Sequence, residues 1–302
     1  MTSSLLLQIN GRSRVFSWKF MLKCGLALLS LNFNELSMDL EELTLVVVDI
    51  AQAAGQAILQ VYESADFNIE QKEDHSPLTA ADLASHHTIL EALQVLTPQY
   101  PVLSEESATL PFTTRSQWQT YWLVDPLDGT REFIKRNGEF SVLIALIHKH
   151  EPVLGVVHAP VLHKTWYASL GNGAYLQSAQ NEPEGLQVRE PSEIITVVGS
   201  RSHAGDSLTD FLKQFEHYEL LSMGSILKAC LVAEGKADIY PRLGNTSEWD
   251  TAAAQIIVEE AGGSLLDLYG QALRYNTKES LLNPHFIVRG NNCFGQSDSP
   301  NH

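Results

Sequence analysis

Apolar residues recur every three to four positions in two stretches near the start of the chain. The first stripe begins at Leu43 and ends at Val61, which predicts an amphipathic helix over residues 39–62. The second follows Thr79, which can cap a helix, and Asp82 has the spacing of a capping box. The polar segment 68–75 between the two helices is expected to form a loop or a hairpin.

Short apolar runs separated by Gly, Pro or Asn follow these helices and are typical of β-strands in a largely antiparallel sheet. They lie at 101–104, 121–124, 141–148, 155–158, 165–169 and 173–176. After Pro191 the pattern predicts a strand followed by three helices, at 194–199, 207–215, 226–233 and 250–261. We therefore expect an α+β domain over 38–192, an α/β domain over 193–289, and a flexible tail over 290–302.

Composition and charge limit the classes of function. The 302 residues include 44% hydrophobic side chains, enough for a large core. The formal charge of −16 argues against a protein held on nucleic acid by counterion release. Cys24, Cys230 and Cys293 are scattered, so we expect reduced thiols and a cytoplasmic setting.

Residues 1–37 differ from the rest because they carry a local charge of +3. No uncharged stretch among them is longer than 24–34, and this is shorter than the roughly 20 residues of a membrane span. No small-residue cleavage site follows it, so export is not expected either. We expect a leader outside the fold, disordered or adventitious, and a folded chain that begins at Met38.

The most informative segment is DPLDGT at 125–130, which follows the strand expected at 121–124. Asp125, Asp128 and the Leu127 carbonyl can converge on a hard divalent cation, which prefers oxygen ligands. Gly129 would let the backbone approach a ligand closely. The alternative is an Asp-rich turn in which Asp128 only caps a helix.

Other acidic residues are ambiguous by themselves. Glu105 and Glu106 are adjacent, so in an extended segment only one of them can face Asp125. Asp250 follows Trp249 at an expected helix start, where it could be only an N-cap. Asp82 could likewise be only the capping-box residue of its helix.

Together, these motifs resemble the inositol monophosphatase superfamily of magnesium-dependent, lithium-sensitive phosphatases. The resemblance rests on SEE at 104–106, DPLDGT at 125–130, and WD at 249–250 before an Ala-rich helix and a glycine pair. Segments 131–140, 200–203 and 227–235 resemble the CysQ-type branch, the 3′(2′),5′-bisphosphate nucleotidases. The implied fold is α+β / α/β, a layered αβαβα sandwich of the inositol monophosphatase and fructose-1,6-bisphosphatase type.

The resemblance also implies roles for single residues. Two or three Mg²⁺ ions would be held by five groups: Glu105, Asp125, the Leu127 carbonyl, Asp128 and Asp250. The attacking water would be oriented by Thr130 with Asp82, or activated by Glu105. The implied substrate contacts are Glu105, Leu127, Asp128, Gly129, Thr130, Arg201, Ser225, Lys228 and Asp250.

The implied reaction removes the 3′-phosphate of adenosine 3′,5′-bisphosphate, giving AMP and phosphate in sulfur metabolism. The alternative within the superfamily is hydrolysis of inositol 1-phosphate or another small phosphate monoester. The resemblance implies a cytoplasmic enzyme without a nucleic acid polymer as partner, and the basic, apolar leader could assist peripheral binding to the inner membrane. The sequence does not indicate an oligomeric state.

Four other classes of protein agree less well with the sequence. Haloacid-dehalogenase-like phosphatases use a related Asp motif, but its two Asp residues are one position closer together. A catalytically silent cation-binding module would keep the fold and bind Mg²⁺ without turnover. Zinc catalysis and P-loop chemistry have little support because the sequence contains no HExxH, Cys/His ligand spacing or GxxxxGK[ST].

Overall fold

The computed structural model describes residues 4–9, 12–17, 39–64, 70–71, 77–107, 110–179, 181–190, 193–200 and 206–290. The chain divides into two compact units, residues 1–39 and 40–302. In the first unit, β1 (Ser4–Ile9) and β2 (Arg12–Ser17) pair as an antiparallel hairpin that the sequence pattern did not predict. All the predicted site residues belong to the second unit.

The first half of the second unit forms a seven-stranded sheet, ordered β11-β10-β9-β8-β7-β6-β5. Every neighbouring pair is antiparallel except β5 and β6, so the largely antiparallel sheet was predicted correctly. Its strands are β5 (Val102–Ser104), β6 (Thr120–Asp128), β7 (Ser141–His148), β8 (Glu151–Ala159), β9 (Lys164–Ser169), β10 (Ala174–Ser178) and β11 (Glu184–Gly185).

Two long helices cover one face of this sheet, α2 (Leu40–Tyr62) and α3 (Ala80–Leu96). The capping box of α3 forms as predicted, because Thr79 and Asp82 bond each other's backbone N–H. The segment between the helices contains β3 (Glu70–Gln71) paired with β4 (Pro77–Leu78), as in the expected hairpin.

A second sheet of five strands, ordered β13-β12-β14-β16-β15, is built from later residues. β12 runs parallel to β13 and β14, whereas β16 pairs antiparallel with β14 and β15. Only β12 was predicted from the sequence. The strands are β12 (Ile195–Ser200), β13 (Tyr218–Met223), β14 (Ile239–Arg242), β15 (Ser264–Asp267) and β16 (Phe286–Arg289).

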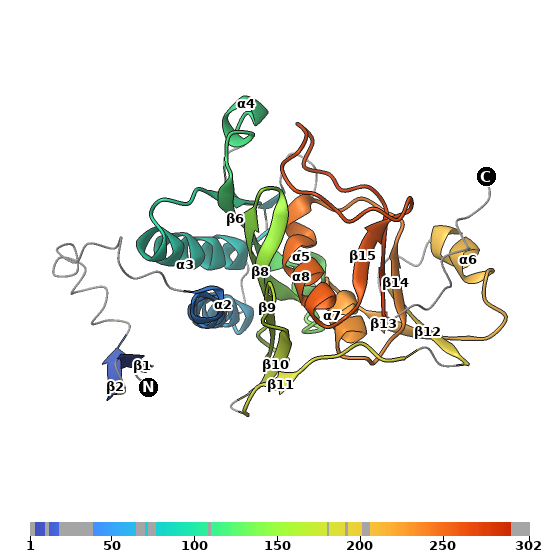
Figure 1. Ribbon diagram of the computed structural model, residues 1–302, viewed down its shortest axis with the longest axis horizontal. Helices are drawn as coiled ribbons and strands as arrows, with labels where there is room; N and C mark the ends of the chain where they lie inside the picture. The colour runs from blue at the N-terminus through green and yellow to red at the C-terminus, as the bar shows by residue number, and fades with distance from the viewer. Residues whose placement is uncertain are drawn as a thin grey trace. The chain divides into compact units, whose positions relative to one another are not determined.

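Helices α7 (Leu227–Ala233) and α8 (Ala252–Glu260) lie between the two sheets (Figure 1). One buried cluster includes residues of both sheets and of both helices, for example Leu143, Val198, Ala229 and Ile257. On the outer face of the second sheet, α6 (Asp206–Leu212) contributes Leu212 to a smaller cluster. The layers are therefore helix, sheet, helix, sheet, helix, which confirms the predicted αβαβα sandwich.

Three short helical turns lie close to the strands that carry the predicted site. They are α4 (Phe112–Arg115), α5 (Thr130–Ile134) and the 3₁₀ turn η2 (Glu248–Asp250). The expected helix over 250–261 was wrong at its start, because α8 begins at Ala252 with Thr251 as N-cap. Asp250 is therefore not the cap of α8.

Among the described residues, α2 alone is long and apolar enough to cross a membrane. Nine of its residues are buried, and the helix packs against β7, β8 and β9. A core helix of a globular protein has the same properties, so its composition does not indicate a span. Cys230 is a buried free thiol, and Cys24 and Cys293 lie outside the described residues.

Candidate active site

The end of β6 carries the first two predicted metal ligands. Opposite β7, Asp125 pairs with Leu143 and Asp128 with Ser141, so β6 holds one extra residue between these pairs. Side chains alternate between faces along a strand, and this bulge restores Asp128 to the same face as Asp125. The bulge therefore explains how two Asp residues three positions apart can serve one site.

Contacts from α3 and from the strand itself hold this bulge in place. The Ser85 hydroxyl donates to the Pro126 carbonyl at 2.7 Å. The Leu127 N–H donates to Oδ1 of Asp125 at 3.0 Å. The chain then leaves the strand at Gly129, which has a φ of +94° and is the N-cap of α5.

Glu105 lies beside Asp125 because β5 and β6 run parallel. Ser104 pairs with Val124, and the Glu105 N–H donates to the Val124 carbonyl at 3.1 Å. The Ser104 hydroxyl is 2.9 Å from Nδ1 of His86 on α3. The two strands therefore deliver Glu105 and Asp125 to the same edge of the sheet.

Asp82 serves its helix and also reaches the predicted site. Its Oδ2 accepts from the N–H and the hydroxyl of Thr79, at 2.7 and 2.6 Å. Its Oδ1 is 3.4 Å from Oγ1 of Thr130, which is also 3.4 Å from the Leu127 carbonyl. The structural role and the predicted contact with Thr130 are thus both present in one buried carboxylate.

Asp250 comes from the second half of the chain and ends the turn η2. Its Oδ2 accepts from the Ser247 N–H at 2.8 Å, in a capping box of that turn. The predicted ligand Asp250 is thus held by its own short turn.

Ser225 and Lys228 lie next to Asp128. Oδ2 of Asp128 accepts from the Ile226 N–H at 2.6 Å and from the Ser225 hydroxyl, which also lies 2.7 Å from Oγ of Ser141. Ser225 has a φ of +54°, unusual for a residue with a side chain. Lys228 is buried, donates to the Met223 and Ser225 carbonyls, and lies over the Tyr240 ring.

A cavity of about 130 Å³ joins several of these residues. Five of its lining residues were predicted as site residues: Asp128, Gly129, Ser225, Lys228 and Asp250. The others are Glu132, Ser200, Ile226, Tyr240, Arg242 and Thr246. Arg201, also predicted, lies outside the described residues.

Arg242 and Thr246 are the most informative of the residues that sequence analysis missed. Nε of Arg242 and Oγ1 of Thr246 are buried and have no hydrogen-bond partner among the described residues. Polar atoms in this state are suited to a ligand. The sequence gives little indication of Arg242. It follows Pro241, and this proline interrupts the apolar run of β14, so the strand is not recognised from the pattern.

Electrostatics connect the four acidic residues. Burial raises the pKa of Asp125 well above its usual value, and the charges of Glu105, Asp128 and Asp250 raise it further. Burial, Asp128 and Glu105 raise the pKa of Asp250 in the same way. Burial also raises the pKa of Asp128, although the Ser225 hydrogen bond opposes it. The four carboxylates are therefore close enough to repel one another.

This donor set fits a divalent cation. Buried carboxylates that repel one another are stabilised by a cation with two positive charges, and Mg²⁺ prefers oxygen ligands. Within the described part of the chain, no three acidic, His or Cys side chains are already arranged to hold an ion. Asp128 and Asp250 instead accept backbone N–H groups, and Mg²⁺ commonly keeps several waters as ligands.

Comparison with known proteins identifies the family of the chain. Residues 39–292 match the model of the inositol monophosphatase family. The chain belongs to this family. Members of the inositol monophosphatase family depend on a divalent metal, typically Mg²⁺.

Several similar proteins within the inositol monophosphatase family carry the name of one particular activity. The chain is 51% identical over 243 residues to the 3′(2′),5′-bisphosphate nucleotidase CysQ of Salmonella typhimurium, a match that covers 80% of this chain and 97% of that protein. It is 47% identical to the protein of the same name from Escherichia coli K12, with the same coverage. The crystal structure of CysQ from Bacteroides thetaiotaomicron superposes with a TM-score of 0.73 at 42% identity, covering 82% of this chain and 96% of that one.

Proposed function

We propose that this chain is a Mg²⁺-dependent 3′(2′),5′-bisphosphate nucleotidase that hydrolyses the 3′-phosphate of adenosine 3′,5′-bisphosphate. The products would be AMP and phosphate, in sulfur metabolism. One observation carries the proposal: the acidic cluster of Glu105, Asp125, Asp128 and Asp250 adjoins a cavity that also holds cationic side chains. Relatives up to 51% identical carry the name of this activity.

The acidic cluster would hold the metal. We propose Glu105, Asp125, the Leu127 carbonyl, Asp128 and Asp250 as the ligands of two or three Mg²⁺ ions. When bound, Mg²⁺ supplies positive charge that acidifies a coordinated water and offsets the charge of the phosphate. Hydrogen bonds that now occupy Asp128 and Asp250 would shift as the ligands turn toward the ions.

Thr130 and Asp82 are placed to orient the attacking water. If the Thr130 hydroxyl donates to Asp82, its lone pairs can accept a hydrogen bond from the water and aim the water's oxygen at phosphorus. The proton released by the water would go to Glu105 or, through Thr130, to Asp82. As the new P–O bond forms, the bond to the ribose 3′-oxygen breaks, and this oxygen takes a proton from a water molecule to become the 3′-hydroxyl of AMP.

Cationic side chains of the cavity would bind the second phosphate. Lys228 and Arg242 both line the cavity beside Asp128 and Asp250. Burial lowers the pKa of Lys228 to about 8, so this side chain still carries a positive charge at neutral pH. The N–H groups of Gly129 and Thr130 and the hydroxyl of Ser225 remain predicted substrate contacts.

The cellular setting is also part of the proposal. A small nucleotide bisphosphate as substrate requires no polymer partner, and a cytoplasmic enzyme would meet it directly. We further propose that residues 1–37, with their local charge of +3, assist peripheral binding to the inner membrane.

A comparison of substrates tests the proposed activity. Phosphate release would be measured with Mg²⁺ from adenosine 3′,5′-bisphosphate, its 2′,5′ isomer, its sulfated relative and inositol 1-phosphate. We expect the nucleotide bisphosphates to be preferred and Li⁺ to inhibit by competing at a metal position. Preference for inositol 1-phosphate would favour the alternative activity, and no release from any of them would favour a silent cation-binding module.

A further inference from the structure

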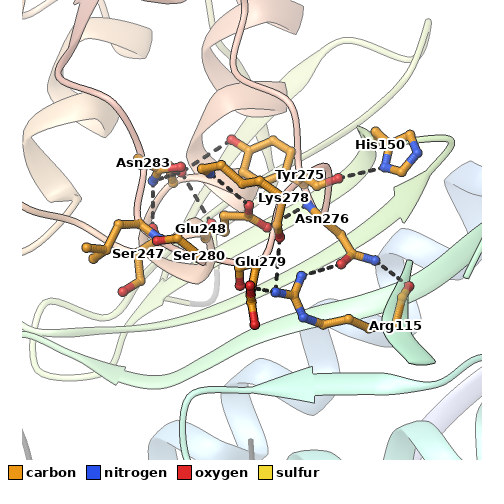
Figure 2. Close-up of polar contacts among 12 residues, drawn as sticks. Arg115, His150, Ser247, Glu248, Tyr275, Asn276, Lys278, Glu279, Ser280 and Asn283 are labelled. Carbon is orange, nitrogen blue, oxygen red and sulfur yellow. Dashed lines mark hydrogen bonds and ion pairs between the residues drawn. The ribbon is translucent and has the colours of Figure 1, made fainter. Parts of the chain in front are cut away.

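A buried arginine links α4 to a distant loop (Figure 2). Arg115 is 2% exposed, and its guanidinium donates to Oδ1 of Asn276 and to the carbonyl oxygens of Lys278 and Glu279. Asn276 returns a hydrogen bond from Nδ2 to the Arg115 carbonyl at 2.6 Å. These bonds hold residues 276–279 within the segment 275–283, which is here called the clamp loop.

Asn276 is the central residue of the clamp loop. Its φ of +56° lies in the left-handed region, which few residues other than glycine adopt without support. Its N–H donates to Oε2 of Glu248 at 2.7 Å, and Nζ of Lys278 lies 3.4 Å from the other oxygen. Asn276 therefore bonds both Arg115 and the fully buried Glu248.

Glu248 begins the turn η2, which ends at Asp250. The clamp loop makes further hydrogen bonds to this turn and to the residues beside it. The Glu248 N–H donates to the Leu281 carbonyl at 2.8 Å. Nδ2 of Asn283 donates to the Ser247 carbonyl at 2.7 Å and lies 2.9 Å from Oγ1 of Thr251.

The carboxylate of Asp250 depends on this arrangement. Its hydrogen bond comes from the N–H of Ser247, whose own carbonyl accepts from Asn283. The placement of Asp250 thus follows the placement of the clamp loop.

We infer that Arg115, Asn276 and Glu248 form a positioning unit that places Asp250 against Asp125 and Asp128. The inference rests on the metal-ligand role proposed for these Asp residues. Its geometric reason is that α4 ends four residues before β6, the strand that carries Asp125 and Asp128. Arg115 thereby ties the start of that strand to the turn of Asp250.

The chemistry of the unit requires these residue types. A guanidinium presents several donors in a rigid plane and can bond three oxygens at once, which a lysine ammonium does with less geometric control. Arg115 and Glu248 are buried opposite charges bridged by Asn276, and Lys278 also pairs with Glu248. Removing Arg115 therefore takes away one of the two cations that act on Glu248, and removing Glu248 leaves Arg115 without that carboxylate. Each change should therefore displace the turn of Asp250.

Metal affinity is the property that tests this inference. Binding of Mn²⁺, a spectroscopically visible substitute for Mg²⁺, would be measured by calorimetry and electron paramagnetic resonance on the full chain and on Arg115→Gln and Glu248→Gln. We expect the Kd for Mn²⁺ to be 10- to 100-fold higher in both variants, because loss of a residue that orients metal ligands typically lowers metal affinity by this factor. Half-maximal phosphate release should need correspondingly more Mg²⁺, while KM for the nucleotide at saturating Mg²⁺ should not change.

Three further variants separate positioning from general loss of stability. Arg189→Gln removes a different Arg–carboxylate pair, with Asp238 just before β14, and should lower stability without changing the Mn²⁺ Kd. The double variant Arg115→Gln/Glu248→Gln should weaken Mn²⁺ binding no more than the stronger single change, because both act along one chain of contacts. Arg115→Lys should restore only part of the affinity.

Folded variants with the Mn²⁺ affinity of the unchanged protein would overturn the inference. If Arg115→Gln does not fold, Glu248→Gln decides, because it keeps the size of the side chain and an acceptor oxygen for Asn276. Weakened Mn²⁺ binding in a protein that releases no phosphate would contradict the proposed function and support the positioning unit. If the unchanged protein is active and its variants bind Mn²⁺ normally, the proposed function is supported and the positioning unit is contradicted. If the unchanged protein does not bind Mn²⁺, both the proposed function and the positioning unit are overturned.

Discussion

His158 on β8 shows how a single buried side chain makes the stability of this protein depend on pH. Its Nδ1 lies 2.9 Å from Oγ1 of Thr165. On the other side, α2 approaches so closely that a Cβ at Gly55 would stand 2.6 Å from the imidazole ring. Burial lowers the pKa of His158 to about 4.

We predict that His158 makes the fold less stable as the pH falls from 7 to 5. The unfolded chain gains a proton near pH 6.5, whereas the folded chain resists protonation until about pH 4. Stability from this residue is thus complete above pH 6.5, and about 3 kcal/mol is lost once pH 4 is reached. Urea unfolding at several pH values would show a shallower fall for His158→Gln than for the unchanged protein.

The exposed His217 provides the control, because its side chain is 77% exposed. His217→Gln should leave the pH profile of stability unchanged. An identical profile for His158→Gln and the unchanged protein would contradict the assigned role of His158.

At the scale of elements, the contact between α8 and β8 decides how the middle layer sits on the first sheet. A Cβ at Gly155 would stand 2.4 Å from the carbonyl oxygen of Ala253 and 2.5 Å from Cγ2 of Ile256. Real Cβ atoms do not come this close to a backbone oxygen. The absence of a side chain at Gly155 thus allows α8 to lie directly on the strand.

Gly155→Ala should therefore displace α8 and destabilise the fold by about 3 kcal/mol, the upper part of the usual range for overpacking. Because α8 follows Asp250 by two residues, the Mg²⁺ concentration for half-maximal activity should also rise. Gly185→Ala is the matched control, since a Cβ at Gly185 on β11 would meet no atom within 4 Å. Equal urea midpoints for the two variants would show that α8 does not depend on this close approach.

Elements with strong local patterns could be predicted from the sequence, and others could not. The apolar stripe of α2 and the Thr79–Asp82 capping box of α3 are local signals, and both helices formed as expected. β13 was missed because five of its six residues are exposed and show no alternation. β14 was missed because Pro241 interrupts it, and β15 and β16 have four residues each.

At the scale of the whole molecule, the site depends on contacts that local sequence does not encode. The motif at 125–130 indicated two ligands, and parallel pairing of β5 with β6 brings Glu105 beside them. The bond between Ser225 and Asp128 joins residues 97 positions apart, and that between Arg115 and Asn276 spans 161. No pattern in a single sequence predicts such pairs.

The division into domains stays a prediction at this scale. The two sheets use separate parts of the chain, ending at Gly185 and beginning at Ile195, close to the expected boundary of 192 and 193. One buried cluster nevertheless continues through both sheets and the helices between them.

The net charge of −16 also acquires a structural meaning. It opposes anionic ligands in general, but the buried Asp125 and the half-buried Asp128 and Asp250 would attract Mg²⁺, and Lys228 and Arg242 supply local positive charge. Binding of a nucleotide bisphosphate would then depend on these few residues.

Phosphate release by Asp125→Asn tests the central claim most directly. Asp125 is buried, repelled by three neighbouring carboxylates and isosteric with Asn, so the variant should fold at least as stably as the unchanged protein. Release from adenosine 3′,5′-bisphosphate would be measured with and without Mg²⁺, with thermal unfolding as the check of folding. The account predicts Mg²⁺-dependent release by the unchanged protein and only background release by folded Asp125→Asn; Mg²⁺-dependent release that persists in the variant would contradict it.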